Sequence, residues 1–303
     1  MAAMMPNKCY ACKTSPAVVE RTRRRWFALC HGLHVADDAA EAWWRELRDS
    51  YEGPGRFYHT LEHVDAMLTL ASDARDALDD AEAVELATFF HDVIYDAERG
   101  GGGANERRSA ERFAAFAEEA VNPVAFSAPR RARVVRWIEL TFTHRCGADA
   151  GGDCRLFMDF DMAILAADRP TYLRYAANVR REYAHVSGVG WRVGRSRFLA
   201  SAAAPAHTVF SSDRFAAREA DARRNAAAEK WRLRAELAAQ VACAAAAAAA
   251  AAREAVDAAA RRAAAVADAK ARGVAKRRAE AEAAEKARAE ADAKRAAVAE
   301  TVS

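Results

Sequence analysis

Large apolar residues recur at helical spacing from Trp26 to Val209, and this pattern limits the possible folds more than any other feature of the sequence. A sheet would instead show apolar and polar residues in alternation, and we find no run of β-branched residues with that period between turn signals. The spacing therefore predicts an all-α protein, a bundle of helices separated by glycine, proline and capping residues.

Turn signals and caps divide this region into nine expected helices. Their approximate bounds are Val18–Leu33, Asp38–Tyr51, Tyr58–Ser72, Asp79 or Asp80 to Val93, Asn105–Ala120, Pro129–His144, Leu156–Ala166, Pro170–His185 and Gly190–Ala203. The fourth of these is apolar nearly all round, so we expect it in the middle of the bundle.

The composition changes at about Asp213. Alanine makes up 39 of the 83 residues after Ala220, and only Trp231 is aromatic there. Such a segment buries too little apolar surface for a core, so we expect a long Ala/charged tail, helical or disordered. Its heptad positions hold mainly alanine, which does not support a strong coiled coil. The predicted organisation is an N-terminal extension (1–20), a globular domain (21–212) and a low-complexity tail (213–303).

Charge excludes a strongly basic nucleic-acid-binding domain. The chain carries 46 basic and 43 acidic residues, a net charge of +3. Of these, 17 basic and 12 acidic residues follow Ala220, so the tail carries +5 and the rest −2. We therefore expect nucleic acid or another anionic partner only at the tail. No stretch of 18 or more strongly apolar residues is present, so we expect no membrane span.

Six scattered cysteines in a chain of this size do not indicate a disulfide scaffold. Cys9 and Cys12, with Cys30 and His34 downstream, have a spacing that suggests zinc. We set this interpretation aside because Cys30 falls inside the first expected helix. The first residues lack the apolar core of a secretion signal, so we expect a cytoplasmic protein, with organelle targeting by the Arg-rich N-terminus as the lesser alternative.

Four residues carry the chemistry: His63, the adjacent pair His91-Asp92, and Asp161. Two imidazoles and two carboxylates form a mixed N/O site suited to Mn, Fe, Zn, Mg, Ni or Co. The pair interrupts an apolar helix, where a buried carboxylate is costly unless a cation or hydrogen bonds compensate it. The alternative is that the pair is simply hydrogen-bonded at a helix end. Asp159 competes with Asp161 for the last position.

The order of several short motifs resembles the predicted metal-dependent phosphohydrolases of the HD superfamily. The resemblance covers about residues 24–210 and rests on the segments Arg56–Val64 (RFYHTLEHV), Phe89–Tyr95 (FFHDVIY), Asn105–Ala110 (NERRSA), Leu156–Leu165 and Arg181–Val186 (REYAHV). It implies an all-α HD-domain helical bundle that hydrolyses a phosphate ester, either a monoester or a diester, with nucleotides as the favoured substrates.

The resemblance also implies roles for single residues. His63, His91, Asp92 and Asp161 would bind a divalent metal, and Asp92 would also orient or deprotonate the attacking water. His59, four residues before His63 and expected on the same helical face, is similar to the proton donor of cyclic-nucleotide phosphodiesterases. A histidine that merely packs beside Tyr58 explains it equally well.

The remaining candidates would contact the substrate. Arg56 and Arg181 suit phosphate oxygens, although surface arginines more often form ion pairs. Asn105 and Glu106 could line the site, or Asn105 could cap a helix. His144 could reach the pocket from the end of its helix. Two rival functions remain open: a catalytically silent nucleotide or metal sensor, and an interaction protein that acts through its charged tail.

Overall fold

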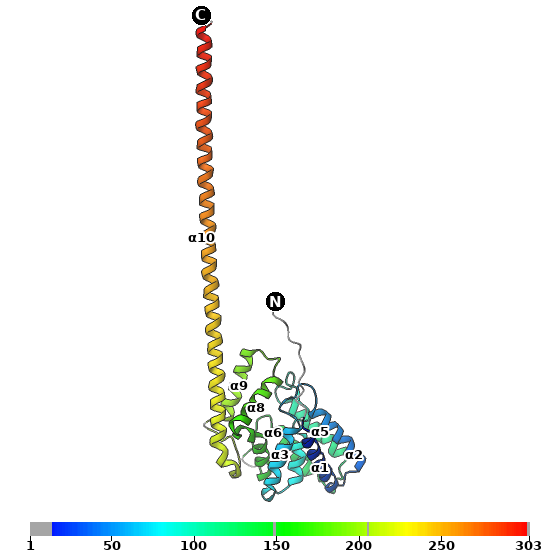
Figure 1. Cartoon of the computed structure of the whole chain (residues 1–303). Helices are drawn as coiled ribbons and strands as arrows, with labels where there is room; N and C mark the ends of the chain where they lie inside the picture. Colours follow the sequence, from blue (N-terminus) through cyan, green and yellow to red (C-terminus); the bar gives the residue numbers. More distant parts are fainter. Residues whose placement is uncertain (1–13, 148–149, 205, 302–303) are drawn as a thin grey trace. The chain divides into compact units, whose positions relative to one another are not determined.

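The computed structural model describes residues 14–147, 150–204 and 206–301, and this part of the chain folds into ten α-helices and three short 3-10 helices (Figure 1). The all-α prediction is confirmed. The α-helices are α1 (Pro16–Gly32), α2 (Asp37–Tyr51), α3 (Leu61–Asp73), α4 (Ala81–Phe90), α5 (Ala104–Glu119), α6 (Ala128–Leu140), α7 (Gly152–Met162), α8 (Arg169–Glu182), α9 (Gly188–Ala202) and α10 (Glu219–Thr301). The 3-10 helices are η1 (Arg75–Ala77), η2 (Ala163–Ala166) and η3 (Asp213–Arg218).

Helix α4 lies at the centre of the bundle, as its all-round apolar sequence predicts. It packs against α3, α5, α6 and α7. Eight of its ten residues are buried, among them Phe89 and Phe90 at its C-terminal end. The Asp80 side chain caps its first turn by accepting a hydrogen bond from the Ala83 amide at 3.1 Å.

Aromatic packing fixes α1 against this central helix. Trp26 is fully buried, its ring centroid lies 5.2 Å from that of Phe89 and 5.1 Å from that of Phe116, and its indole N–H donates to the Ala40 carbonyl at 2.8 Å. The apolar surface of the indole ring is thereby buried, and its one polar atom has a hydrogen-bond partner. A Trp26→Ala change in such a site costs about 3–5 kcal/mol of folding free energy.

Two of the helix ends that differ from the sequence expectation lie at the site described below. Helix α3 begins at Leu61 and not at Tyr58, because Thr60 caps it and accepts a hydrogen bond from the Glu62 amide. His59 therefore precedes the helix and does not share a helical face with His63. Helix α4 ends at Phe90, so the His91-Asp92 pair lies in the turn that follows and not inside the helix.

The compact unit of the structure runs to Ala235, so the boundary expected at residue 212 lies inside it. The first turns of α10 contribute fully buried alanines, Ala222 and Ala226, and the buried Leu233. The Asn225 side chain donates to the carbonyls of Leu165 and Ala167 at 2.9 Å each. Some alanines of this stretch are therefore buried in the compact unit. The alanine content of the sequence could not distinguish these alanines from the solvent-exposed ones that follow.

The N-terminal boundary also moves. Helix α1 begins at Pro16 after the cap Ser15, and Val18 is buried, so part of the expected extension belongs to the bundle. Cys9 and Cys12 lie outside the described residues.

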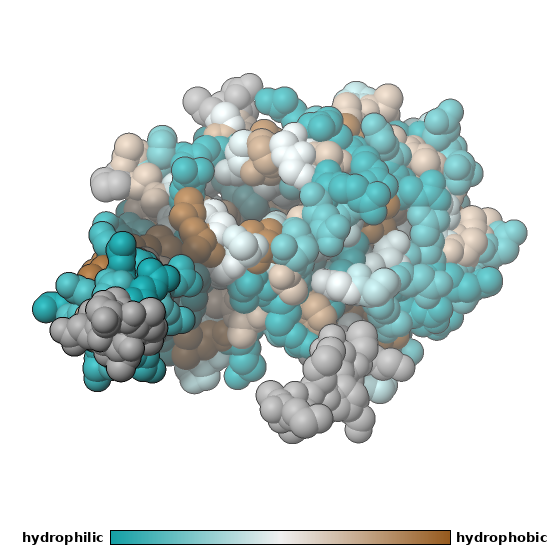
Figure 2. All heavy atoms as spheres, turned by 90° about the horizontal axis from the view of Figure 1, so that it is seen from above, coloured by the Kyte–Doolittle hydropathy of each residue, from teal (hydrophilic) through white to brown (hydrophobic). Residues whose placement is uncertain are grey.

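The second unit, Glu236–Ser303, consists of the remainder of α10. The valines whose side chains the structure describes, Val241, Val256, Val266 and Val274, are exposed, and ion pairs such as Arg278–Glu282 follow the surface at i, i+4 spacing. The expectation that no segment is apolar enough to span a membrane is corrected here. The helical segment Asp213–Arg295 contains an 18-residue window with mean hydropathy 1.5 and none of it buried, so by length and composition one helix qualifies as a candidate membrane span. Most of the molecular face in Figure 2 is hydrophilic, with hydrophobic residues in small groups.

Candidate metal centre

His91 sits at the C-terminal end of α4 with one ring nitrogen already engaged. Its Nδ1 lies 2.9 Å from the Thr88 carbonyl oxygen, which can only accept, so Nδ1 carries the hydrogen. In the neutral ring Nε2 then carries a free lone pair, and metal-binding histidines adopt this arrangement. Only 1% of the His91 residue surface is exposed.

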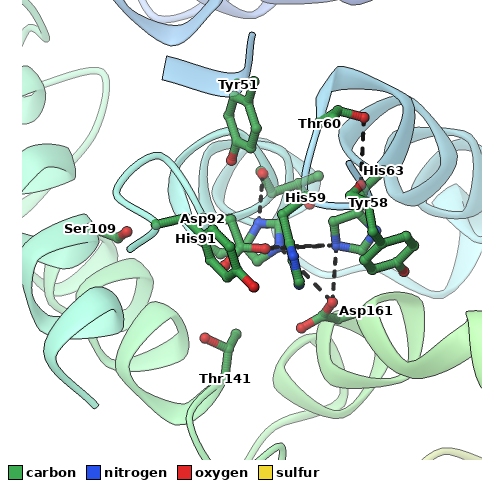
Figure 3. A network of polar contacts seen from close by, with 12 residues as sticks. Tyr51, Tyr58, His59, Thr60, His63, His91, Asp92, Ser109, Thr141 and Asp161 are labelled. Atoms are coloured by element: carbon green, nitrogen blue, oxygen red, sulfur yellow. Dashed lines mark hydrogen bonds and ion pairs between the residues drawn. The ribbon is translucent and has the colours of Figure 1, made fainter. Parts of the chain in front are cut away.

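His63 reaches the same point from the first turn of α3. Its Nε2 lies 3.2 Å from Nε2 of His91, and its ring packs 4.9 Å from that of Tyr58 (Figure 3). Two imidazoles that aim the same nitrogen at one point gain from a shared cation.

Asp92 completes the group. Its Oδ2 lies 3.0 Å from Nε2 of His91 and 4.0 Å from Nε2 of His63. One ligand atom from each of the three residues lies within 4.8 Å of the others, and both histidines are buried. These residue types fit a metal ion: a buried His-His-Asp arrangement of this size can hold one, preferably an ion that accepts mixed N/O ligands.

The geometry separates the two aspartates of α7. Asp161 points toward the three-residue group, with Oδ1 3.1 Å from Nε2 of His63 (Figure 3). Asp159 is buried elsewhere, where it accepts hydrogen bonds from the amides of Ser211 and Ser212 at 2.6 and 2.8 Å. Asp159 therefore anchors the chain just before η3, and Asp161 is the one beside the candidate metal centre.

Electrostatics of the site favour a cation. Burial opposes a charge on His91, but the Asp92 and Asp161 carboxylates outweigh it and raise its pKa to about 9. Burial lowers the pKa of His63. The histidines hold the pKa values of both aspartates well below their usual range. The carboxylates thus stay ionised and hold positive charge between them.

A second carboxylate, Glu182 at the end of α8, organises the segment before α3. Its Oε1 accepts hydrogen bonds from the amides of Phe57, Tyr58 and His59 at 2.7, 2.7 and 3.0 Å. Its Oε2 lies 2.7 Å from Nδ1 of His59 and accepts the Tyr95 hydroxyl at 3.1 Å. Burial disfavours the charged His59 ring, but Glu182 and Asp92 outweigh it and raise its pKa.

Arg56 contacts backbone carbonyls around the site, and its expected contact with phosphate stays a prediction. It is 7% exposed, and its guanidinium donates to the carbonyls of Asp92 (2.7 Å), Val93 (2.9 Å) and His59 (3.0 Å). The carbonyls of Asp92 and Val93 follow the end of α4, where carbonyls lack helical partners and a cation is favourable. Arg56 therefore positions the segments that carry His59 and Asp92.

Arg181 is not among the described residues that line the pocket. Its guanidinium packs over the Phe57 ring at 3.8 Å from the centroid, and it lies 3.5 Å from the Asn178 side-chain oxygen. Its expected contact with the substrate stays a prediction. The next residue, Glu182, is the one that reaches the site.

Asn105, Glu106 and His144 do line the pocket. Asn105 is not the N-cap of α5, because Gly103 occupies that position with φ 78°. The Asn105 side chain instead accepts a hydrogen bond from the Asp96 amide at 3.0 Å and donates one to the Asp96 carbonyl at 3.3 Å. Glu106 Oε2 is buried without a hydrogen-bond partner among the described residues, and burial raises the pKa of this carboxyl.

His144 contacts the outer oxygen of Asp161. Its Nε2 lies 2.9 Å from Oδ2, so the imidazole supports the carboxylate whose other oxygen faces His63. The expected helix ends earlier, at Leu140, and His144 adopts a left-handed φ of 52°. It reaches the pocket from a turn and not from a helix end.

The pocket beside the candidate metal centre has a volume of about 570 Å³. Its lining contains both polar and apolar side chains. The apolar and aromatic ones include Met162, Ile164, Leu165, Val179, Tyr183, Val186, Trp191 and Phe198. The lining also contains the carboxylates of Asp92, Asp96, Glu98, Glu106 and Asp161.

Among the described residues that line this pocket, Arg195 is the only lysine or arginine. Its guanidinium forms a two-point ion pair with the buried Glu229 of α10, at 3.1 and 3.2 Å, and donates to the Tyr175 hydroxyl at 3.1 Å. The positive charge of Arg195 is thus matched by a carboxylate of its own.

Sequence reasoning missed Glu182 and Glu229. Neither has a local signal: the first contacts residues 123 to 125 positions earlier in the chain, and the second contacts Arg195 34 positions earlier. A charged residue on the apolar face of a helix is the sign that could have identified them.

No family model matches the chain, and no curated protein matches it. The structure therefore defines a coarse class: an all-helical protein with a buried His-His-Asp group that can hold a metal ion.

Proposed function

We propose that the protein is a metal-dependent hydrolase of phosphate esters, of the HD type that its sequence motifs resemble. One observation carries the proposal: Asp92, a member of the buried group with His63 and His91, lines a pocket, and His59, held by Glu182, lines the same pocket. A metal ion that activates water, beside a histidine that can protonate the leaving oxygen, suits phosphoester hydrolysis.

Asp161 is the proposed fourth ligand, which makes a two-histidine, two-carboxylate set suited to Mn, Fe, Zn, Mg, Ni or Co. Such an ion, when bound, lowers the pKa of water toward neutrality and polarises a phosphoryl oxygen. Asp92 lines the pocket and orients the attacking water or accepts its proton.

His59 is the proposed general acid. Its Nδ1 faces Glu182 at 2.7 Å, which leaves Nε2 as the nitrogen that gives a proton to the leaving oxygen. Burial makes this charge costly, but the neighbouring carboxylate outweighs burial and raises the pKa of His59, which favours the protonated ring.

The pocket favours one phosphate group joined to an apolar or aromatic alcohol. Five carboxylates line it, and Arg195 is already paired with Glu229, so the metal must supply the positive charge that holds the phosphate. Trp191 and Tyr183, with ring centroids 5.6 Å apart, offer aromatic surface for a flat group such as a nucleobase. A nucleoside monophosphate fits this pattern better than a triphosphate, whose further charges would face carboxylates.

Metal analysis combined with a phosphoester panel tests the proposal. The purified full chain is analysed for bound metals, stripped, reloaded with each of several divalent ions, and assayed on monophosphates, cyclic phosphates and triphosphates. We expect turnover with at least one ion and a preference for monophosphates. Tight ligand binding without turnover on any substrate would instead identify a sensor.

The two aspartates of α7 give a matched pair for the same test. Asp161→Asn should reduce metal content and turnover, whereas Asp159→Asn should leave metal content per folded protein unchanged. Equal metal content in both variants would remove Asp161 from the ligand set.

A further inference from the structure

Two cysteines flank the loop that joins His144 to the helix bearing Asp161. Cys146 follows His144 by two residues, and Cys154 lies in the first turn of α7. Their Sγ atoms are 2.9 Å apart, although both are free thiols. A disulfide has an S–S distance of about 2.05 Å, so the sulfurs need to approach by only about 0.9 Å.

The surroundings hold one sulfur fixed and leave the other accessible. Cys154 is 2% exposed, and its neighbour Asp153 fixes the start of α7 by accepting hydrogen bonds from the amides of Asp79 and Asp80 at 2.9 and 2.8 Å. Cys146 is half-buried. An oxidant therefore meets Cys146 first, and Cys154 lies in place to attack it.

A shared metal ion is the other ligand that two close thiols could serve. Among the described residues, however, no further His, Cys, Asp or Glu joins these sulfurs in a metal-binding group. A soft metal prefers more than two thiolate or imidazole ligands. The geometry therefore favours bond formation between the sulfurs.

We propose that Cys146 and Cys154 form a reversible disulfide that ties the His144 loop to α7. With a disulfide oxidant such as oxidised glutathione, the Cys146 thiolate attacks one glutathione sulfur and releases the first glutathione thiolate. Cys154 then loses its proton and attacks Cys146 Sγ, which releases the second. The two thiols lose two hydrogens, and one oxidised glutathione becomes two reduced molecules. The hydrogen bond between the thiols lowers the pKa of Cys146 and raises that of Cys154, which suits this order of attack.

The bond has a local consequence. It closes the loop after His144, whose Nε2 lies 2.9 Å from Oδ2 of Asp161, onto the helix that carries Asp161. The oxidised protein should melt about 5–10 °C higher than the reduced one, because the bond removes loop freedom from the unfolded chain. It should also lose metal more slowly to a chelator; this second effect rests on the proposed function, whereas bond formation does not.

Peptide mapping of the full chain tests the bond directly. Trypsin cuts after Arg145 and Arg155, so both cysteines fall in the single peptide 146–155. After equilibration in glutathione buffers and alkylation, we expect this peptide to be unalkylated and lighter by about two mass units, the two lost hydrogens. The exposed Cys243 should carry glutathione under the same conditions.

Cys154→Ser supplies the matched control, because it should trap glutathione on Cys146. Thermal melts of the oxidised and reduced proteins should differ, and the difference should vanish in the Cys146→Ser, Cys154→Ser double variant. A stable glutathione adduct on Cys146 of the unsubstituted chain overturns the proposal. Alkylation of both Cys146 and Cys154 under conditions in which Cys243 carries glutathione also overturns it. An intact bond in a protein that binds no metal would instead count against the proposed function alone.

Discussion

Glu182→Gln should separate the chemistry of His59 from that of the metal group, because it removes one negative charge and almost no volume. The carboxylate accepts five hydrogen bonds, three of them from consecutive amides of residues 57–59. The side-chain oxygen of a glutamine can still accept the hydrogen bonds from these three amides. Its NH₂ group must then face Nδ1 of His59 and force that nitrogen to accept.

The cost in stability follows from the pKa of Glu182. Burial alone would raise it, but His59 and the backbone amides outweigh burial and lower the pKa from 4.5 to about 2. A shift of this size corresponds to about 3 kcal/mol of folding free energy. For a unit of this length the Glu182→Gln variant should melt about 6–12 °C lower at neutral pH. Because the folded pKa is depressed, the stabilisation is present above pH 4.5 and lost as the pH falls through about 2. The gap between the two proteins should therefore close on acidification.

The kinetic effect has a direction of its own. Without the carboxylate the pKa of His59 falls, so the alkaline limb of the kcat/KM profile should move to lower pH. Turnover of esters with poor leaving groups should lose part of the ~10²–10⁴-fold that a general acid supplies. Nitrophenyl phosphate, whose leaving group needs no proton, should lose less.

Glu118→Gln on the exposed face of α5 is the matched control and should change neither quantity. An unshifted alkaline limb in a folded Glu182→Gln protein would refute the role of Glu182 in holding His59 as an acid. A melting difference that stays constant from above pH 4.5 down to about pH 2, the window that the titration of Glu182 spans, would refute the origin of the stabilisation.

Three further predictions concern other parts of the chain. His91→Ala should abolish metal retention, measured by elemental analysis, and turnover with it; full activity in the metal-free variant would exclude the metal hypothesis. His59→Ala should keep the metal and lose roughly 10²–10⁴-fold in rate on unactivated esters, with equal losses on nitrophenyl phosphate counting against a general acid. A chain ending at Ala235 should melt and bind metal like the full protein. A chain ending at Ala220 should be destabilised by about 3–5 kcal/mol or fail to fold, because buried Arg195 loses its carboxylate; equal melting of the two chains would contradict this.

The helices were predictable because strong local signals mark them. Prolines in the first turns of α1, α6 and α8 start three of them, and Asp80 caps a fourth. Errors occurred where a distant residue decides the end of a helix. The amides of residues 57–59 bond to Glu182 and not to a helical turn, so α3 starts later than its apolar spacing suggests.

The candidate site was predictable in its residue types and less so in its supports. His63, His91, Asp92 and Asp161 do come together, since each interrupts an apolar stretch that must face the core. Arg56, which the sequence placed at a phosphate, has backbone carbonyls as its partners in this structure. Charge and spacing do not reveal such partners, because any arginine suits a carbonyl as well as a phosphate.

The solvated part of α10 will dominate some measurements on this protein. Its described side chains beyond Glu236 are almost all exposed, so its amides are held by local helical hydrogen bonds alone. They should exchange with deuterium far sooner than those of α4, and proteases should cut at its many lysines and arginines first. A far-UV circular dichroism melt will sum a gradual loss from this helix with the sharp transition of the bundle. Unfolding of the unit that carries the candidate metal centre should therefore be followed through its buried tryptophans.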